Sequence, residues 1–473
     1  MIDSISKSGV DCVKKNTIRY FFTYVPSTVF LFFYSFTVAY VSFIYGLQGD
    51  TLFHIKIGEY ISKFGIPKLD PFSWTTNGKP WFAHEWLWDL IISKLYYSLG
   101  YIGVFILHFI SISLITFCIY ALVKQRLFPF LTFLFLVNTT LIRGFYSLRP
   151  QTLIYGFFAL FLCAVSRRSK FKQITFSFFL FFLFTIWANM HSSVVLVLGF
   201  LLILTLFKTT TWIDFFCALV GSVLNPHGWR LFFFAIKLSN LPTTADRITE
   251  WFSPDFHYLP TLLVFLYILF CLIITAIHSV KEKKLYLNLV LFFVTIALFL
   301  KSFRHLPFLL MTTVFAGFDN RTIEKWFSSA LIVLLIIFNF LFIEPFQLKK
   351  MTAFDLKKEF PVDAVVFMKK NGYTDRIWNE YHYGNYLMFQ DIKTSVDGRG
   401  DLFALQNPVL WEDYFSFMEL KSEKPEEILE KYSIKYVLFP KSFICMKYLK
   451  NIDRWKIIYE DDKDVVMGLS DGK

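Results

Sequence analysis

The sequence predicts an α-helical polytopic membrane protein with a small α/β domain at its C-terminal end. Of the 473 residues, 55% are hydrophobic, 21% are aromatic and only 18% are charged, so the chain is more apolar than a soluble globular domain. Lysine and arginine outnumber acidic residues by 28 to 15 in residues 1–345, whereas residues 346–473 hold 20 basic and 21 acidic residues. This change predicts a transmembrane domain over 1–345 and a separate domain over 346–473.

Windows of about twenty apolar residues, long enough to cross a hydrocarbon core roughly 30 Å thick, predict about eleven transmembrane helices. We expect them at residues 24–46, 101–123, 127–142, 152–166, 173–188, 191–207, 211–224, 259–279, 285–301, 306–318 and 327–343. Several windows are short, so tilted, re-entrant or merged segments are open alternatives. The polar first twenty residues show no cleavable signal peptide, and the first apolar run is expected to stay as an anchor.

Basic clusters in short loops set the expected orientation, because such loops are retained on the cytoplasmic side. The clusters are "KKNTIR" at 14–19, "KQR" at 124–126, "RRSKFK" at 167–172 and "KEKK" at 281–284. If each span changes the side, all four fall on the same face. The pattern predicts a multi-pass protein of the cell (plasma or inner) membrane with a cytoplasmic N-terminus. The long first loop, 47–100, and the C-terminal domain are then extracytoplasmic.

Side chains suited to binding or catalysis gather on this outer face. An ionisable residue at the centre of a membrane helix costs about 2.5 to 3.5 kcal/mol on insertion scales, and such residues usually line a cavity. We therefore expect an outer-face site, whose candidate residues are Asp50, His54, Glu59, Asp70, His84, Glu85, Arg143, Arg149, Asn189, His191, Asn225, His227, Glu250, Arg304, His305, Asp397 and Arg399.

The segment "GDTLFHIKIGEYISKFG" follows the first span and has the apolar spacing of a helix on the membrane surface. Asp50 and His54 are four residues apart and share a face of this helix, whereas Glu59 points elsewhere. Asp is also a favoured N-cap residue, so Asp50 as a cap is an alternative to Asp50 in catalysis.

The rest of the first loop is predicted as an ordered irregular link followed by a second amphipathic helix. Three prolines and the Asn77–Gly78 turn mark the link, and the helix is expected from His84 to Leu99. Its Trp and Tyr residues suit interfacial anchoring. His84 and Glu85 are either site residues or polar residues of the first turn.

Arginines at outer helix ends indicate an anionic partner. Arg143 and Arg149 flank a span end, and Arg304 with His305 forms a similar pair. A guanidinium suits a phosphate, while contact with lipid headgroups is the alternative. The histidines show no HExxH or other tight metal spacing, and the six cysteines are scattered. No Gly-rich phosphate loop or nucleic-acid-binding pattern is found.

The C-terminal domain is predicted to alternate helices and strands. "PVDAVVFMKKNG", "YGNYLMF" and "PEEILEKYS" read as helices, and "DRIWNEY", "KTSVDGR" and "IKYVLFP" as strands. "RWKIIYEDDKDVVMGL" is expected to form a closing hairpin. The segment "KTSVDGR" is expected as a strand and a turn, with Asp397, Gly398 and Arg399 at the end of the strand, where Asp397 and Arg399 serve either binding or a structural turn.

These residues resemble those of the GT-C superfamily of membrane glycosyltransferases. The similarity covers most of the chain through "GDTLFHIKIGEYI", "GIPKLDPFSWTTNGKPWFAHEWL", "LRPQ", "WANMHSS", "NPHG", "EWFSPD" and "VDGRGDLF". The resemblance implies Asp50 as catalytic acid or base, with His54 or Glu59 in support. It also implies Arg143, Arg149 or Arg304 as ligands of the phosphate of a polyprenyl-linked sugar. The chain lacks a WWDYG-like motif and a second acid beside Asp50.

The expected activity is transfer of a sugar from a polyprenyl-phosphate donor to an acceptor on the extracytoplasmic face, with inversion at the anomeric carbon. One carboxylate to deprotonate the acceptor and one or two arginines to stabilise the phosphate suffice for this chemistry. The acceptor class (glycan, lipid or protein) and a divalent metal (Mg or Mn) are left open. The alternatives are a transporter or flippase and a non-catalytic envelope assembly subunit.

Overall fold

The computed structural model describes residues 28–29, 31–43, 49–122, 146–241, 247, 251–258, short stretches of 261–273, 285–316 and 356–470. The spans predicted at 127–142 and 327–343 lie outside the described residues. Those predicted at 24–46 and 259–279 are described only in part.

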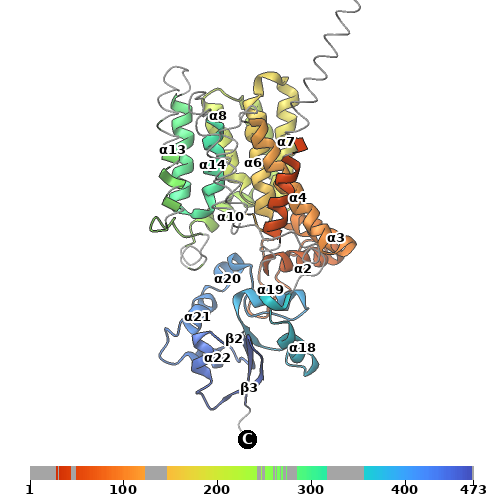
Figure 1. Ribbon diagram of the computed structural model, residues 1–473, viewed down its shortest axis with the longest axis vertical. Helices are drawn as coiled ribbons and strands as arrows, with labels where there is room; N and C mark the ends of the chain where they lie inside the picture. Colours follow the sequence, from red (N-terminus) through yellow and green to blue (C-terminus); the bar gives the residue numbers. More distant parts are fainter. Residues whose placement is uncertain are drawn as a thin grey trace, which may run out of the picture.

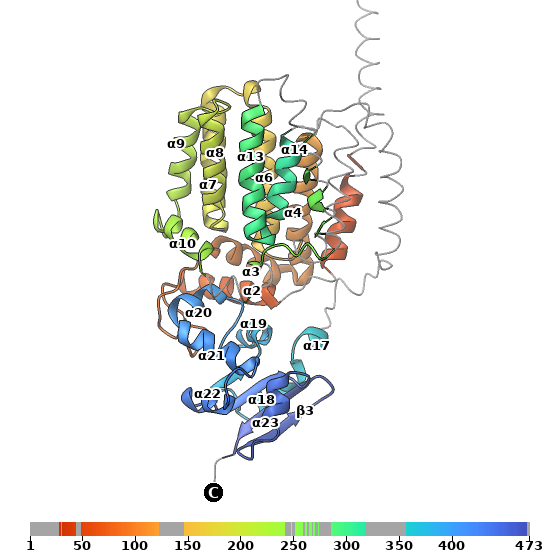
Figure 2. The same ribbon diagram turned by 90° about the vertical axis from the view of Figure 1, so that its left-hand side faces the viewer.

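The membrane part is a bundle of roughly parallel and antiparallel helices (Figures 1 and 2). Its described helices are Leu31–Phe43, α4 (Tyr101–Leu122), α6 (Pro150–Ser166), α7 (Gln173–Met190), α8 (Val194–Leu206), α9 (Trp212–Val223), α13 (Leu285–Lys301) and α14 (Leu306–Phe315). Within the described residues, α4 and α7 are long and apolar enough to cross a membrane alone. The others are shorter but apolar, as the sequence windows predict.

The outer surface of the bundle carries apolar stripes that water would not favour. On α7, Ile174, Phe178, Phe182 and Ile186 follow one another at every fourth position and are each between 44% and 66% exposed. Residues four apart lie on the same face of a helix, so these side chains form one continuous apolar stripe. Such an all-apolar exterior indicates that lipid surrounds the bundle.

Two helices of the first loop lie across one end of the bundle (Figure 2). They are α2 (Gly49–Phe64) and α3 (Trp86–Leu99), which confirm the two helices predicted for this loop. A Cβ at Gly58 would lie 1.9 Å from the backbone oxygen of Asp89, so glycine is what allows α2 and α3 to cross this closely. The two helices form a platform between the bundle and the C-terminal domain.

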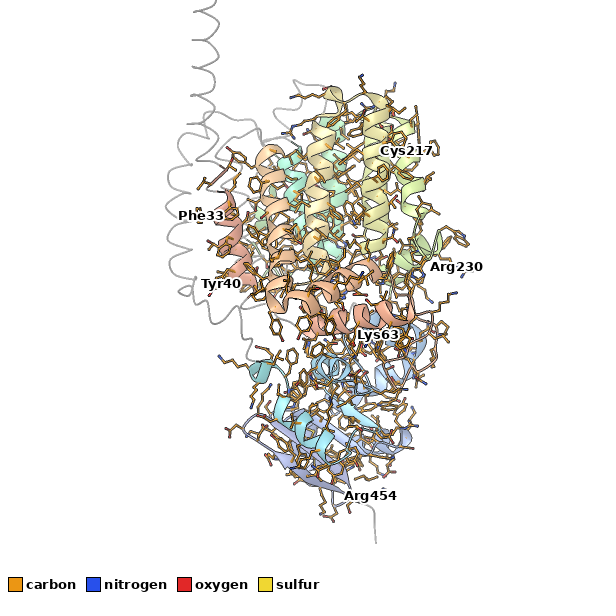
Figure 3. The ribbon with its side chains drawn as sticks, turned by 90° about the vertical axis from the view of Figure 1, so that its right-hand side faces the viewer. Phe33, Tyr40, Lys63, Cys217, Arg230 and Arg454 are labelled. Carbon is orange, nitrogen blue, oxygen red and sulfur yellow. The ribbon has the colours of Figure 1, made fainter. Side chains whose placement is uncertain are left out.

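A further helix, α10 (Arg230–Ser239), lies at the same end of the bundle and was not predicted. Trp229, Phe233 and Ile236 are exposed on it, while Leu231 and Phe234 are buried. Figure 3 shows Arg230 at this level of the molecule, as it does Lys63 of α2. A short helix with one buried apolar side suits the membrane interface.

The C-terminal domain contains a four-stranded sheet in the order β1-β2-β4-β3. The strands are β1 (Ile377–Asn379), β2 (Tyr436–Pro440), β3 (Trp455–Glu460) and β4 (Asp464–Leu469); β1 and β2 are parallel and the other pairs antiparallel. The helices are α17 (Leu356–Glu359), α18 (Val362–Lys370), α19 (Tyr381–Phe389), α20 (Gly400–Gln406), α21 (Pro408–Met418), α22 (Pro425–Lys431) and α23 (Ile444–Leu449).

Most elements predicted for this domain are confirmed, including the β3–β4 hairpin, but the strand predicted at "KTSVDGR" is wrong. That segment makes one isolated bridge, between Thr394 and Ser73 of the first loop. Thr394, Ser395 and Asp397 are all fully buried, which the alternation of a surface strand does not produce. The segment instead joins the C-terminal domain to the first loop through buried polar groups.

Candidate active site

A cavity of about 730 Å³ lies where the bundle, the first loop and the C-terminal domain meet. The first loop and α6 contribute Asp50, His84, Glu85 and Arg149, and the C-terminal domain contributes Tyr381, His382 and Asp401. The first loop, the helix bundle and the C-terminal domain, which are distant in sequence, therefore line one cavity. Seven of the predicted outer-face residues line this cavity, namely Asp50, His84, Glu85, Arg149, His191, Arg304 and His305.

The cavity has a polar part and an apolar part. Its apolar wall comes from α6, α8, α13 and α14, with Ile154, Tyr155, Val195, Leu196, Phe200, Ile203, Val294, Leu298 and Phe308. Gly199 of α8 also lines it, and a Cβ at this position would meet nothing within 4 Å. Lining residues from Val195 to Ile203 extend roughly 12 Å along the helix at 1.5 Å per residue. The apolar part therefore runs along these helices as a groove, which we call the α8–α13 groove.

Asp50 and Arg149 form an ion pair in the polar part. Arg149 Nε lies 2.7 Å from Asp50 Oδ2, and both side chains are about one-fifth exposed. Asn385 Nδ2 donates to Asp50 Oδ1 at 3.3 Å, and the Asn385 oxygen accepts a hydrogen bond from the backbone of Gly398. The C-terminal domain thus holds the same carboxylate from the other side.

The positive charges of the cavity come from three helix ends. Arg149 stands at the N-terminal end of α6, while Lys301 and Arg304 stand at the junction of α13 and α14. The Arg304 guanidinium lies over the ring of Trp251, 4.3 Å from its centroid, which fixes its orientation. His305 also lines the cavity. These cations border the entrance to the α8–α13 groove, so an anionic group with an apolar tail fits the lining.

Glu85 stands between two imidazoles. Its Oε1 lies 3.4 Å from His191 Nε2 and 3.7 Å from His84 Nε2. All three residues line the cavity, Glu85 and His84 from the start of α3 and His191 from the turn between α7 and α8. Burial raises the pKa of Glu85, and the charges of Asp89 and Asp401 add to this rise.

His54 lies behind the lining rather than in it. It is buried, and its Nδ1 is 2.5 Å from Asp89 Oδ1. Burial lowers the pKa of His54 to about 4 and raises that of Asp89 well above its usual range, so the neutral forms are favoured and one proton lies between the two side chains. The pair joins α2 to α3 beneath the cavity.

Asp70, Asp397 and Arg399 form a buried ion triplet beside the cavity. Arg399 donates through Nη1 to Asp70 Oδ1 at 2.6 Å and through Nη2 to Asp397 Oδ2 at 2.7 Å. Its guanidinium also lies over the ring of Trp81. Burial alone would lower the pKa of Arg399, but the two carboxylates raise it. The triplet joins the first loop to the C-terminal domain next to Gly398, Gly400 and Asp401, which line the cavity.

Four other predicted residues do not line the cavity. Glu59 pairs with Lys56 and Lys63 on α2, and Asn189 accepts a hydrogen bond from Trp86 Nε1. Asn225 accepts from the backbone of His227 in a turn. The His227 ring stacks on Phe82, with centroids 3.7 Å apart. Arg143 and Glu250 lie outside the described residues.

The structure also adds residues that the sequence did not single out. They are Gln151, Trp251, Lys301, Tyr381, His382 and Asp401, together with the groove residues above. Gln151, Trp251 and Asp401 lie in the quoted segments "LRPQ", "EWFSPD" and "VDGRGDLF", so these three belonged to motifs that carry the resemblance. Apolar groove residues carry no such signal, because a cavity-lining Leu looks like any other Leu of a span.

Among the described residues, no group of three or more His, Cys, Asp or Glu side chains is placed to hold a metal ion.

Comparison with known proteins gives a clear result for the fold. The sequence matches no protein-family model and no curated protein. Among solved structures, it is similar to the apo oligosaccharyltransferase of Archaeoglobus fulgidus, with a TM-score of 0.54, 10% identity, and coverage of 89% of this chain and 70% of that one. It is also similar to ArnT from Cupriavidus metallidurans bound to undecaprenyl phosphate, with a TM-score of 0.50, 11% identity, and coverage of 94% and 98%.

Both neighbours are members of the GT-C superfamily, so the chain has a GT-C-like fold, as the sequence motifs predicted. At these identities the likeness concerns the fold. The chemistry has to be argued from the cavity itself.

Proposed function

We propose that this protein is a membrane glycosyltransferase that moves a sugar from a polyprenyl-phosphate-linked donor to an acceptor. The observation that carries the proposal is the two-part cavity, in which the Asp50–Arg149 ion pair stands in the polar part and the α8–α13 groove forms the apolar part. A lipid-linked phosphate sugar has the same two parts, a charged head and an apolar chain.

The polyprenyl chain is proposed to lie in the α8–α13 groove. The groove offers aliphatic and aromatic walls without charge, so an apolar chain stays in apolar surroundings when it moves there from the bilayer. The similarity to a protein whose structure contains undecaprenyl phosphate supports a donor of this class. Gly199 leaves room for the chain, since its missing side chain faces open space.

The phosphate is proposed to bind Arg149 and Arg304, with Lys301 nearby. Guanidinium groups bind phosphate oxygens through two parallel hydrogen bonds, and such charge-assisted bonds are about twice as strong as neutral ones. As the sugar leaves, the phosphate gains negative charge, so these cations stabilise the transition state more than the ground state.

Asp50 is proposed to act on the sugar. Glycosyl transfer passes through an oxocarbenium-like state with positive charge at the anomeric carbon, and a fixed carboxylate beside it lowers the barrier. The acceptor hydroxyl attacks from the side opposite the phosphate, so one displacement inverts the anomeric centre. A cavity carboxylate must also take the acceptor's proton.

The site is proposed to face the extracytoplasmic side together with the C-terminal domain. The four basic loops predicted as cytoplasmic include 167–172, which joins α6 to α7 at the end of the bundle away from the domain (Figure 2). The positive-inside rule then puts the cavity on the outer face. The acceptor is a glycan, lipid or protein reached from that side.

Release of undecaprenyl phosphate from a panel of undecaprenyl-phosphate monosaccharides tests this function without knowledge of the acceptor. Purified protein is incubated with each donor and with simple alcohols or water as acceptor. Asp50→Asn is expected to lower turnover at least about 10²-fold, in the range seen when one transition-state-stabilising group is removed. Glu427→Gln, which changes an exposed acid of α22, is the matched control.

Donor turnover unaffected by Asp50→Asn would remove Asp50 from the reaction. Movement of the intact lipid across a proteoliposome, without any glycosyl product, would instead support the transporter alternative.

A further inference from the structure

His191 and His84 lie beside Glu85, and the backbone contacts of each ring indicate which ring nitrogen carries the proton. The backbone N–H of Ser193 donates to His191 Nδ1 at 3.0 Å, so this nitrogen is the acceptor and the ring proton is on Nε2. That Nε2 lies 3.4 Å from Glu85 Oε1 and 3.4 Å from the Gln151 side-chain amide, so its N–H stands between these two side chains. His191 therefore borders the Glu85 carboxylate on one side.

His84 is held in the opposite tautomer. Its Nδ1 lies 3.2 Å from the carbonyl oxygen of Phe82, which only accepts, so Nδ1 carries the proton. In the neutral ring its Nε2 is the acceptor, and it faces the same Glu85 oxygen at 3.7 Å. Glu85 thus lies beside the Nε2 atoms of both His191 and His84.

We propose that Glu85 is the general base that takes the proton of the acceptor hydroxyl, and that His84 receives this proton from it. The inference rests on the proposed glycosyl transfer and assigns the proton step within it. Glu85 contacts the reacting hydroxyl and takes its proton first, and His84 then accepts this proton. His191 positions the Glu85 carboxylate.

Asp50 is less suited to this step. Its Oδ2 forms an ion pair with Arg149 at 2.7 Å and its Oδ1 accepts a hydrogen bond from Asn385, so both oxygens already have partners. Arginine stays charged in proteins and cannot pass a proton on. A carboxylate fixed in this way suits electrostatic stabilisation of the sugar, whereas the carboxylate beside an unprotonated imidazole nitrogen suits proton transfer.

The surroundings of Glu85 favour proton uptake. Besides His84 and His191, the titratable groups facing it are His54 of α2, Asp89 of α3 and Asp401 of α20. Burial raises the pKa of Glu85 and the two acids add to the rise, whereas His84 and His54 oppose it when their rings carry a positive charge. A base whose pKa is raised toward the working pH is both ionised enough and strong enough to act.

The acceptor oxygen forms a bond to the anomeric carbon as the bond from that carbon to the phosphate oxygen breaks, and the bonding electron pair goes to the phosphate. The hydroxyl proton moves to Glu85 Oε1 and then to His84 Nε2. The products are the glycosylated acceptor and a polyprenyl phosphate with one additional negative charge, next to Arg149.

The sign of the pH dependence follows from this role. The active form has Glu85 ionised, so turnover is lost as the pH falls through its raised pKa and is constant above it. This loss of turnover is the acidic limb of the pH profile, and it should disappear when the Glu85 carboxylate is removed. Glu85→Gln is expected to lower kcat by about 10² to 10⁴-fold, the usual contribution of a general base, and to flatten the acidic limb of the kcat profile.

Turnover of an undecaprenyl-phosphate monosaccharide between pH 5 and 9 tests the proposal in wild type, Glu85→Gln, Glu85→Ala and Asp50→Asn. Formate added to Glu85→Ala is expected to restore turnover in proportion to its concentration, because a small carboxylate fits the vacated space. Asp50→Asn is expected to lower kcat while it keeps the acidic limb. His84→Gln, which retains Glu85, is expected to lower kcat about 10-fold.

Binding of undecaprenyl phosphate to each variant, read as a shift in unfolding temperature, separates the two proposals. Wild-type protein that neither binds this lipid nor releases it from any donor overturns the proposed function. Wild-type turnover whose acidic limb survives in Glu85→Gln, or that formate does not restore in Glu85→Ala, overturns the role of Glu85 alone. If the Glu85 variants do not fold, a wild-type kcat in His84→Gln overturns the proton path from Glu85 to His84.

Discussion

Arg149 Nε lies 2.7 Å from Asp50 Oδ2, and this contact joins the N-terminal end of α6 to the first turn of α2 inside the cavity. Both side chains are partly exposed to the cavity. Arg149 can therefore bind a negative group of a substrate while Asp50 faces a positively charged part of the same substrate. The pair therefore explains how one site binds a phosphate and stabilises a cationic sugar at the same time.

Substitution of Arg149 should weaken both the binding of the phosphate and the stabilisation of the cationic sugar. Arg149→Ala is expected to lower kcat/KM for the lipid donor by about 10² to 10³-fold, because the phosphate loses a charge-assisted partner and Asp50 is left unpaired. Arg149→Lys keeps the charge but not the planar fork and should recover only part of the loss. Steady-state kinetics on the same donor measure this. Equal kcat/KM in wild type and Arg149→Ala would contradict a phosphate-binding role.

Gly398 fixes Asp50 from the side of the C-terminal domain. A Cβ at residue 398 would lie 2.9 Å from Asp50 Oδ1 and 2.6 Å from the ring of Phe53. Gly398→Ala should therefore displace the carboxylate and lower kcat while donor binding is largely kept. Gly372→Ala, at a surface turn, controls for the loss of a glycine elsewhere in the domain. A Gly398→Ala protein with wild-type kcat would show that Asp50 does not need this contact.

The ion triplet around Arg399 should be a determinant of stability. Removing one partner of a buried ion pair costs about 3–5 kcal/mol, because an unpaired charge stays buried. Arg399→Ala is expected to destabilise the protein by this order, whereas Arg454→Ala, at an exposed pair with Glu430, should change stability by less than about 1 kcal/mol. Thermal unfolding in detergent measures both. Similar unfolding temperatures for the two variants would contradict the structural role of the triplet.

The orientation of the chain can be tested by chemical labelling. Single cysteines at Lys170, between α6 and α7, and at Glu427, in α22, lie at opposite ends of the molecule. A membrane-impermeant maleimide added to intact cells is expected to label residue 427 but not residue 170. Labelling of residue 170 without permeabilisation would reverse the proposed topology.

Much of the fold could be predicted because it depends on local patterns. Apolar windows located α4, α6, α7, α8, α9 and α13, and the spacing of apolar residues located α2 and α3. The helix α10 was missed since it is short and amphipathic and follows a span closely. The strand expected at "KTSVDGR" was wrong because its partner is the first loop, about 320 residues away in the chain, as the Thr75–Ser395 hydrogen bond shows.

The site could be predicted only as a set of residues on one face. Sequence motifs brought Asp50, Glu85, Arg149, His191 and Arg304 to attention, but their distances depend on how the helices pack. The contact of Asp50 with Asn385 joins residues 335 positions apart, and no local pattern reports it. For the same reason, the separation of Arg399 from the cavity lining and the presence of Asp401 within it required the structure.

Photo-crosslinking of a polyprenyl phosphate tests the central claim most directly. An undecaprenyl phosphate analogue with a diazirine in its first isoprene units should label peptides from α8 and α13. Gly199→Leu, which fills the α8–α13 groove, should abolish this labelling, while Gly199→Ala should keep it. Labelling confined to other helices, or labelling of α8 and α13 that Gly199→Leu leaves unchanged, would contradict the proposal that the cavity holds a lipid-linked phosphate.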